Sequence, residues 1–226
     1  MQVTKTLYIN VLGVLNVTVS APSKTYTGTQ ITVTVRLSGD VYGHWEVDVN
    51  WDDGTTEHHT FYDELPPWSL THTYSKTGTF KITVSVDDMG SGASGTGTAT
   101  ITVAAPVSVS FTASNTNPRV NEQVTFTADI SGGFPPYTWR IDYGDGTSES
   151  KTLDSPGRVT RSKAYSRAGT YKVVLTVTDS LGTAMTAGLE IGAAVPGVPA
   201  EIDWRLVGGV AAALAVGYIL YRASRG

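Results

Sequence analysis

The fold is decided by Tyr137-Thr-Trp-Arg-Ile-Asp-Tyr143-Gly-Asp-Gly-Thr147, which has a counterpart earlier in the chain, Trp45-Glu-Val-Asp-Val-Asn-Trp51-Asp-Asp-Gly-Thr55. In both halves a Tyr-x-x-x-Gly step and an alternating apolar run follow, beginning at Tyr74 and at Tyr165. Gly54 and Gly146 are 92 residues apart, and Tyr74 and Tyr165 are 91 residues apart. A shared period of this size predicts two copies of one domain.

Apolar and polar residues alternate through each copy of the stretch, which is the period of a half-buried strand. A slip of one residue would turn every inward side chain outward, so agreement between the copies fixes the register. Several more short alternating segments with turn residues between them follow in each half, and together they predict an all-β fold of two tandem immunoglobulin-like β-sandwiches. The inward positions before the turn are Trp45, Val47, Val49 and Trp51 in the first copy and Tyr137, Trp139, Ile141 and Tyr143 in the second.

Composition narrows the class of protein. The 226 residues suffice for two domains of about 100 residues each. The net charge of -4 at pH 7 argues against a nucleic-acid partner. The chain has no cysteine, which excludes disulfides, cysteine nucleophiles and thiolate metal sites.

The predicted sandwiches span residues 15–104 and 107–192. The short linker Ala104-Ala105-Pro106 between them predicts two domains stacked end to end with little freedom to swing. Residues 1–14 carry a strand signal and lack the apolar run of a signal peptide. We interpret them as an extra edge strand of the first sandwich; the alternatives are the last strand of a preceding domain and a strand added to a neighbouring subunit.

The C-terminal part predicts a membrane anchor. Residues 193–203 form a Pro- and Gly-containing spacer, and residues 204–221 combine a run without charge with an aromatic residue at each end. As a helix this segment spans about 27 Å, enough for the hydrocarbon core of a bilayer. The tail, residues 222–226, contains two arginines, so the positive-inside rule predicts a single-pass protein with its sandwiches outside and its C-terminus in the cytoplasm or inside a virion.

Each repeat resembles the polycystic-kidney-disease-type (PKD) domain. In the second repeat the resemblance is carried by Ser131-Gly-Gly-Phe-Pro-Pro-Tyr, by Asp142-Tyr-Gly-Asp-Gly-Thr147 and by the segment from Ala164 to Asp179. The first repeat matches more loosely through Asn50-Trp-Asp-Asp-Gly-Thr55 and His72-Thr-Tyr-Ser-Lys-Thr-Gly-Thr-Phe80. The resemblance implies an extracellular, non-catalytic β-sandwich that serves as a spacer, an adhesion module or a protein-contact module.

The tryptophan of the family motif falls on Val49 and Ile141 in this chain. We expect Trp45, Tyr137 and Trp139, which come earlier in the same strands, to fill that core volume.

Carboxylates are the first candidates for chemistry. In the first repeat they are expected to gather at one end of the domain, with a matching set in the second, and oxygen-rich loop ends can bind calcium. Their spacing follows no dedicated calcium loop, so turn capping is the favoured interpretation and no cofactor is expected. The residues are Asp52, Asp53, Asp87, Asp88, Asp142, Asp145 and Asp179.

Histidines and nucleophile motifs give little support for other chemistry. His44, His58, His59 and His72 all lie in the first repeat, but the adjacent His58 and His59 would point to opposite faces of a strand, which disfavours a shared zinc ion. The sequence contains no serine nucleophile motif and no phosphate-binding loop, so we do not expect an enzyme.

Three further features are candidates for interaction or modification. Tyr62 and Trp68 place aromatic rings around a Pro-Pro turn, where they either stack on a sugar or protein partner or form a small core of the loop. Asn16 begins the one Asn-x-Thr glycosylation sequon. Gly209, Ala213 and Gly217 recur every four residues in the predicted membrane helix, where small residues allow helices to pack closely.

The sequence therefore predicts a membrane-anchored surface protein, microbial and perhaps archaeal or viral, whose stacked sandwiches act as a spacer, an adhesin or a contact in a larger assembly. The alternatives are a carbohydrate- or substrate-binding appendage of a longer extracellular hydrolase and a structural protein of a virion envelope. The expected partners are membrane lipid, other surface or membrane proteins and further copies of the chain, with carbohydrate as a further candidate.

Overall fold

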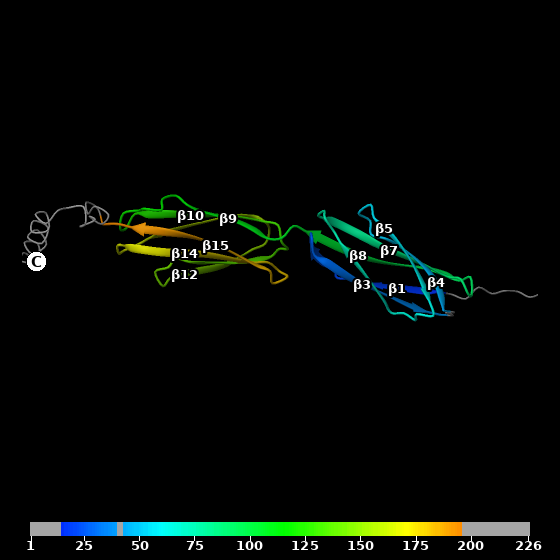
Figure 1. Cartoon of the computed structure of the whole chain (residues 1–226). Helices are drawn as coiled ribbons and strands as arrows, with labels where there is room; N and C mark the ends of the chain where they lie inside the picture. The colour runs from blue at the N-terminus through cyan, green and yellow to red at the C-terminus, as the bar shows by residue number, and fades with distance from the viewer. Residues whose placement is uncertain (1–14, 40–42, 196–226) are drawn as a thin grey trace, which may run out of the picture.

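A computed structural model of the chain describes residues 15–39 and 43–195. The regular secondary structure within these ranges consists of β-strands alone. Figure 1 shows two sandwiches that follow each other end to end. The predicted strand in residues 1–14 and the predicted membrane helix in residues 204–221 lie outside the described residues. Within the described ranges no helix has the length and hydropathy needed to cross a membrane.

The first sandwich packs a three-stranded sheet, in the order β1-β3-β6, against a five-stranded sheet, in the order β2-β8-β7-β4-β5. All pairs are antiparallel except β2 with β8, which is parallel. The strands are β1 (Asn16–Ser20), β2 (Lys24–Tyr26), β3 (Gln30–Ser38), β4 (His44–Asn50), β5 (Thr56–Tyr62), β6 (Trp68–Thr73), β7 (Gly78–Asp88) and β8 (Ser94–Ala104).

The second sandwich repeats this plan with sheets in the orders β13-β10-β9 and β12-β11-β14-β15. Where the first sandwich has β2, the second has a single parallel bridge between Arg119 and Ala194. Its strands are β9 (Ser108–Ala113), β10 (Gln123–Ser131), β11 (Tyr137–Asp142), β12 (Ser148–Leu153), β13 (Gly157–Ala164), β14 (Gly169–Thr178) and β15 (Ala184–Ala193).

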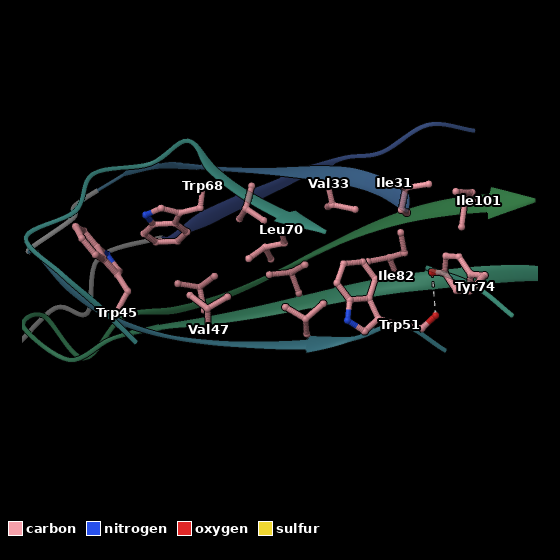
Figure 2. Packing of buried hydrophobic residues seen from close by; sticks show 14 of the residues in the cluster. Ile31, Val33, Trp45, Val47, Trp51, Trp68, Leu70, Tyr74, Ile82 and Ile101 are labelled. Atoms are coloured by element: carbon pink, nitrogen blue, oxygen red, sulfur yellow. Dashed lines mark hydrogen bonds between the residues drawn. The ribbon is translucent and has the colours of Figure 1, made fainter. Parts of the chain in front are cut away.

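Each sandwich has its own hydrophobic core, and the predicted register is confirmed. The four inward positions before the turn are at most 1% exposed in the first copy and at most 2% exposed in the second. Trp45, Tyr137 and Trp139 are buried, as expected for side chains that fill the volume of the missing family tryptophan. Figure 2 shows Trp45 at one end of the first core and Tyr74 toward the other, with aliphatic side chains of both sheets between them.

Strand β1 crosses very close to β8, and this contact depends on two glycines. A Cβ atom on Gly95 would lie 2.4 Å from the carbonyl oxygen of Leu15, and one on Gly97 would lie 2.6 Å from that of Val17. Side chains at these positions would collide with backbone. The Gly-rich segment over residues 90–97 is only partly loop, because β8 begins at Ser94.

Candidate functional site

The junction between the sandwiches is a built contact between side chains of both. The hydroxyl of Tyr26, at the end of β2, donates a hydrogen bond to Oδ2 of Asp179, which follows β14. The ring of Tyr26 lies 5.5 Å from the ring of Phe134, and Nζ of Lys24 lies 5.1 Å from the centre of that ring. Aromatic and cation–π contacts of this kind favour one relative orientation of the two domains.

Asp179 is 5% exposed and is held by hydrogen bonds on both oxygens. Oδ2 also accepts from the backbone N–H of Phe134 at 3.0 Å, and Oδ1 accepts from those of Leu181 and Thr183 at 3.0 and 3.1 Å. Burial raises the pKa of this carboxyl, but the hydrogen bonds from Tyr26 and the backbone outweigh it, so the pKa lies below its usual value. The aspartate therefore caps its own turn and receives the neighbouring domain.

The linker is held against the second sandwich as well. The N–H of Gly133 donates to the carbonyl of Ala105 at 2.8 Å. Gly132 adopts a φ of +65°, and a Cβ atom there would lie 2.2 Å from the carbonyl oxygen of Pro106. The close approach of linker and turn thus requires glycine at this position.

Asp53 and Asp145 cap the turns that follow β4 and β11, which is the role that the sequence analysis favoured over calcium binding. Oδ1 of Asp53 accepts from the N–H and hydroxyl of Thr55 at 3.0 and 2.6 Å, and Asp145 makes the same contacts with Thr147 at 3.0 and 2.5 Å. Asp52 accepts from the N–H of Lys81 at 2.9 Å, and Asp142 accepts from that of Gly144 at 3.0 Å.

A second contact ties each turn to a neighbouring strand. Nε2 of His72 lies 2.8 Å from Oδ2 of Asp53, and its ring stacks on Trp51 at 4.5 Å. In the second repeat Nζ of Lys163 lies 2.7 Å from Oδ2 of Asp145 and 5.3 Å from the centre of the Tyr143 ring. For Asp53 and Asp145 alike, burial raises the pKa, while the hydrogen bonds outweigh it and leave the pKa lowered.

The structure does not bring the aspartates of each repeat together at one end, contrary to the expectation. Asp88 pairs with Trp45 at the beginning of β4, whereas Asp52 and Asp53 follow its end. In the second repeat Thr178, next to Asp179, pairs with Thr138 near the beginning of β11, while Asp142 and Asp145 lie at the other end. Antiparallel pairing of the long strands separates them by the length of the sandwich, and Asp87 pairs with Glu46 near the Asp88 end. The described residues include no group of three or more carboxylates and histidines suited to a metal ion.

The histidines lie in separate environments and do not contact one common group. His58 lies on the outer face of the sheet, with Nε2 2.6 Å from Glu46 and Nδ1 2.8 Å from Asp48. The hydrogen bond with Asp48 is the main cause of a raised pKa for His58. His59 contacts Glu57 at 3.1 Å, and His44 stacks against Tyr62 with ring centres 4.4 Å apart. The outer face also holds a shallow depression of about 510 Å³, lined by polar residues that include Asp48, Asn50 and His58.

The two residues predicted as candidates for interaction, Tyr62 and Trp68, differ in their exposure to solvent. Tyr62 is 69% exposed and remains a candidate for contact with a partner. Trp68 is not available for contact with a partner: it begins β6, is 2% exposed and stacks on Phe61 with ring centres 4.3 Å apart. Its Nε1 donates to the carbonyl of Glu64 at 3.1 Å, which fixes the loop between the two residues. Trp68 is therefore part of the core, in agreement with the small-core interpretation of this loop.

The remaining candidates concern modification and membrane packing. Asn16 is the first residue of β1 and is exposed, so the sequon is open to solvent. Gly209, Ala213 and Gly217 lie outside the described residues.

Sequence reasoning anticipated a tight linker but missed Lys24, Tyr26 and Phe134 as junction residues. The available signal was the sequence similarity of the two repeats, in which Asp88 and Asp179 hold matching positions 91 residues apart. Nothing in one sequence shows which tyrosine reaches across a domain boundary.

Comparison with known proteins gives one family for both sandwiches. A family model described as the PKD domain matches residues 15–105, and a second model with the same description matches residues 104–191. No sequence of a curated protein matches the chain.

Solved structures resemble one or both sandwiches. The PKD domain of an M14-like peptidase from a Thermoplasmatales archaeon is 22% identical over 39% of this chain and 94% of its own, with a TM-score of 0.32. The PKD domain of a human VPS10 domain-containing receptor is 21% identical over 41% of this chain and 76% of its own, with a TM-score of 0.34. An I-band fragment of titin is 11% identical over 80% of this chain and 65% of its own, with a TM-score of 0.51, which reflects a shared fold.

Proposed function

The chain belongs to the PKD domain family, of which it carries two copies in tandem, and from this premise we propose that it is a membrane-anchored surface protein that works as a stiff spacer. The observation that carries the proposal is the junction, where Tyr26, Lys24, Phe134 and Asp179 fix one sandwich on the next. A spacer holds its far end at a set distance only if its domains do not swing freely.

Anchoring is supported by sequence. Residues 204–221 are long and apolar enough for a membrane helix and are followed by arginines. With the anchor at the C-terminus, the second sandwich lies near the bilayer and the first carries the far end. We expect no catalytic activity, because PKD domains typically serve as contact and spacer modules.

Membrane attachment is tested with the full chain and two matched variants. Ala213→Arg places a charge in the middle of the apolar segment, where it opposes insertion, and Ala213→Leu keeps the segment apolar. The full chain and Ala213→Leu are expected to stay with membranes after alkaline carbonate extraction, whereas Ala213→Arg is expected to be released. Release of all three proteins would overturn the anchor but leave the spacer testable on its own.

A second candidate function is the binding of carbohydrate by the outer face of β4 and β5. The observation that favours it is the exposed ring of Tyr62 on the same face as Glu46, Asp48 and His58, since sugar sites combine an aromatic platform with polar groups. Retention of the wild-type protein on insoluble polysaccharides, lost in Tyr62→Ala and kept in Ser150→Ala on the second sandwich, would support it. Equal retention of both variants would count against it.

A further inference from the structure

The shallow depression of about 510 Å³ on the outer face of the first sandwich lies over β4, β5 and β7. Asn50 pairs with Thr56 at one end of β4, and His44 pairs with Tyr62 at the other. The depression lies at the Asn50 end, so the exposed ring of Tyr62 is not part of it. The outward side chains that line it are those of Asp48, Asn50, Thr56, His58, Thr83 and Ser85.

The same six places exist in the second sandwich, because its strands pair in the same register. Asp48 lies between its neighbours on β5 and β7 as Arg140 lies between its neighbours on β12 and β14. Asn50 corresponds in the same way to Asp142. In the order given for the first sandwich, the six counterparts are Arg140, Asp142, Ser148, Ser150, Val174 and Thr176. Asp48 therefore takes the place that an arginine has in the second sandwich.

In the second sandwich the guanidinium of Arg140 reaches along the face to the next pair of residues. Its Nη2 donates to the hydroxyl of Ser148 at 3.1 Å and lies 3.4 Å from Oδ2 of Asp142. A planar guanidinium with several N–H donors suits a surface of hydroxyl and carboxylate oxygens. The second sandwich thus holds a guanidinium of its own where the first has its depression.

The first sandwich keeps the acceptors of this arrangement without the cation. Thr56 retains the hydroxyl of Ser148, and the lining of the depression, all of it within the described part of the chain, includes no lysine or arginine. Oδ1 of Asp48 lies 2.8 Å from Nδ1 of His58, whereas its Oδ2 makes no hydrogen bond to another described residue. Nε2 of His58 lies 2.6 Å from Glu46, so one imidazole stands against two carboxylates. The depression is therefore acidic even when His58 is protonated.

The charge of the whole sandwich acts in the same direction. Residues 15–104 contain ten aspartates and glutamates but only four lysines and arginines, whereas residues 105–195 contain eight of each class. An excess of negative charge raises the local concentration of cationic ligands and speeds their association. The first sandwich therefore attracts a cationic partner, and the second does not.

From the depression, its filled counterpart and this charge, we propose that the depression binds an arginine side chain of a partner protein. The guanidinium donates to Oδ2 of Asp48 and to the hydroxyl of Thr56, as Arg140 donates to Ser148 in the second sandwich. Arginine is favoured over lysine because its planar fork can reach both acceptors at once. The proposal goes beyond the spacer function, since it gives the side of the rod a contact of its own, and it does not depend on the membrane anchor.

Binding is tested with the full chain in detergent micelles, followed by the amide NMR signals of β4, β5 and β7. The probe is a blocked pentapeptide with a central arginine between glycines, and its control has citrulline, which keeps the shape but lacks the charge. We expect the arginine peptide to shift the signals of Asn50, Thr56 and Thr83 to saturation, and the citrulline peptide to bind several-fold more weakly. Equal binding of the two peptides, or no shift at these residues, would overturn the proposal.

Two matched variants locate the site. Asp48→Asn removes a charge from the depression and is expected to weaken binding of the arginine peptide several-fold. Asp63→Asn makes the same change in charge outside the depression and should leave the affinity as it is. Equal losses in both variants would mean that the peptide follows the net charge of the sandwich, and the proposal would be wrong.

A third variant tests the comparison between the two sandwiches. Arg140→Ala removes the guanidinium that the second sandwich supplies for itself and leaves Asp142 and Ser148 open to the probe. We expect the arginine peptide to shift the signals of these two residues in Arg140→Ala and not in the wild type. If the opened place binds no arginine peptide, these positions do not recognise a guanidinium and the proposal fails.

Discussion

The hydroxyl of Tyr26 in the first sandwich donates a hydrogen bond to the carboxylate of Asp179 in the second, and that carboxylate also accepts three backbone N–H groups of its own domain. One side chain therefore closes a turn and joins two domains. Stability of the second sandwich and orientation of the first are coupled at this residue, because loss of the ionised form removes contacts from both.

Acid is expected to loosen the junction through Asp179. Its pKa is lower in the folded protein than in the unfolded chain, so the ionised form contributes stability that is present above the unfolded pKa of about 3.9. That stability is lost as the pH falls through the folded pKa. We expect the melting temperature of the second sandwich to fall between pH 5 and pH 2 in the wild type, and to fall less in Asp179→Asn. Parallel acid curves for the two proteins would contradict this assignment.

A substitution at the linker contact is expected to change how freely the two sandwiches move relative to each other. Gly132→Ala should push the turn away from Pro106, because its Cβ would lie 2.2 Å from a backbone oxygen. Gly146→Ala is the matched control, with a similar φ of +87° and no atom within 4 Å of the added Cβ. The chain has no cysteine, so spin labels on Ser94→Cys and Ser148→Cys report the distance between the sandwiches. Only Gly132→Ala is expected to broaden that distance distribution; an unchanged distribution would show that linker contact does not hold the domains.

The sandwich cores were predictable and the junction was not, for a physical reason. Trp45, Val47 and Trp51 are assigned to the inner face of the sheet by alternation alone, because side chains two residues apart on a strand point to the same face. This assignment does not depend on which residues they contact. The partner of a polar group depends instead on the folded arrangement. Asp88 is the last residue of β7 and Asp179 directly follows the equivalent strand β14, yet Asp179 accepts a hydrogen bond from Tyr26 of another domain. The prediction that the aspartates gather at one end of each sandwich failed for the same reason. The sequence motif does not show that Asp52 and Asp53 lie at one end of β4 while Asp87 and Asp88 lie opposite its other end.

Tyr74 and Tyr165 predict matched losses of stability. The hydroxyl of Tyr74 donates to the carbonyl of Trp51 at 3.1 Å, and that of Tyr165 donates to the carbonyl of Tyr143 at the same distance. Burial raises the pKa of both phenols to about 12. Tyr→Phe at either position should cost its own sandwich about 1–2 kcal/mol, because it leaves a buried carbonyl with one partner fewer. Denaturant unfolding followed by amide NMR signals of each sandwich would measure the two losses separately, and a neutral effect at both would refute the role of the hydroxyls.

His58 is expected to titrate above the ordinary histidine value of 6.5. Contact of its ring with Asp48 and Glu46 favours the protonated form, so the contribution to stability is present at low pH and is lost as the pH rises through the raised pKa. The NMR chemical shift of the His58 ring against pH gives the midpoint directly. Asp48→Asn should lower that midpoint, while Asp63→Asn, which removes a carboxylate not bonded to the ring, should leave it in place.

Close approach of β1 to β8 gives the last prediction. Gly97 is buried and pairs with the buried Val84 in β7, whereas Gly188 is exposed and pairs with Val174 in β14, so Gly188 serves as a control strand glycine away from the β1 contact. A Cβ on Gly97 would lie 2.6 Å from the carbonyl oxygen of Val17, whereas one on Gly188 would have its nearest neighbour at 3.4 Å, an ordinary contact. Gly97→Ala should therefore displace β1 and cost about 1–3 kcal/mol of overpacking energy. Gly188→Ala should be neutral or stabilising by up to about 1 kcal/mol, because alanine loses less backbone entropy on folding than glycine. Chemical denaturation of both variants decides the matter: equal effects would mean that β1 does not depend on a bare backbone at Gly97.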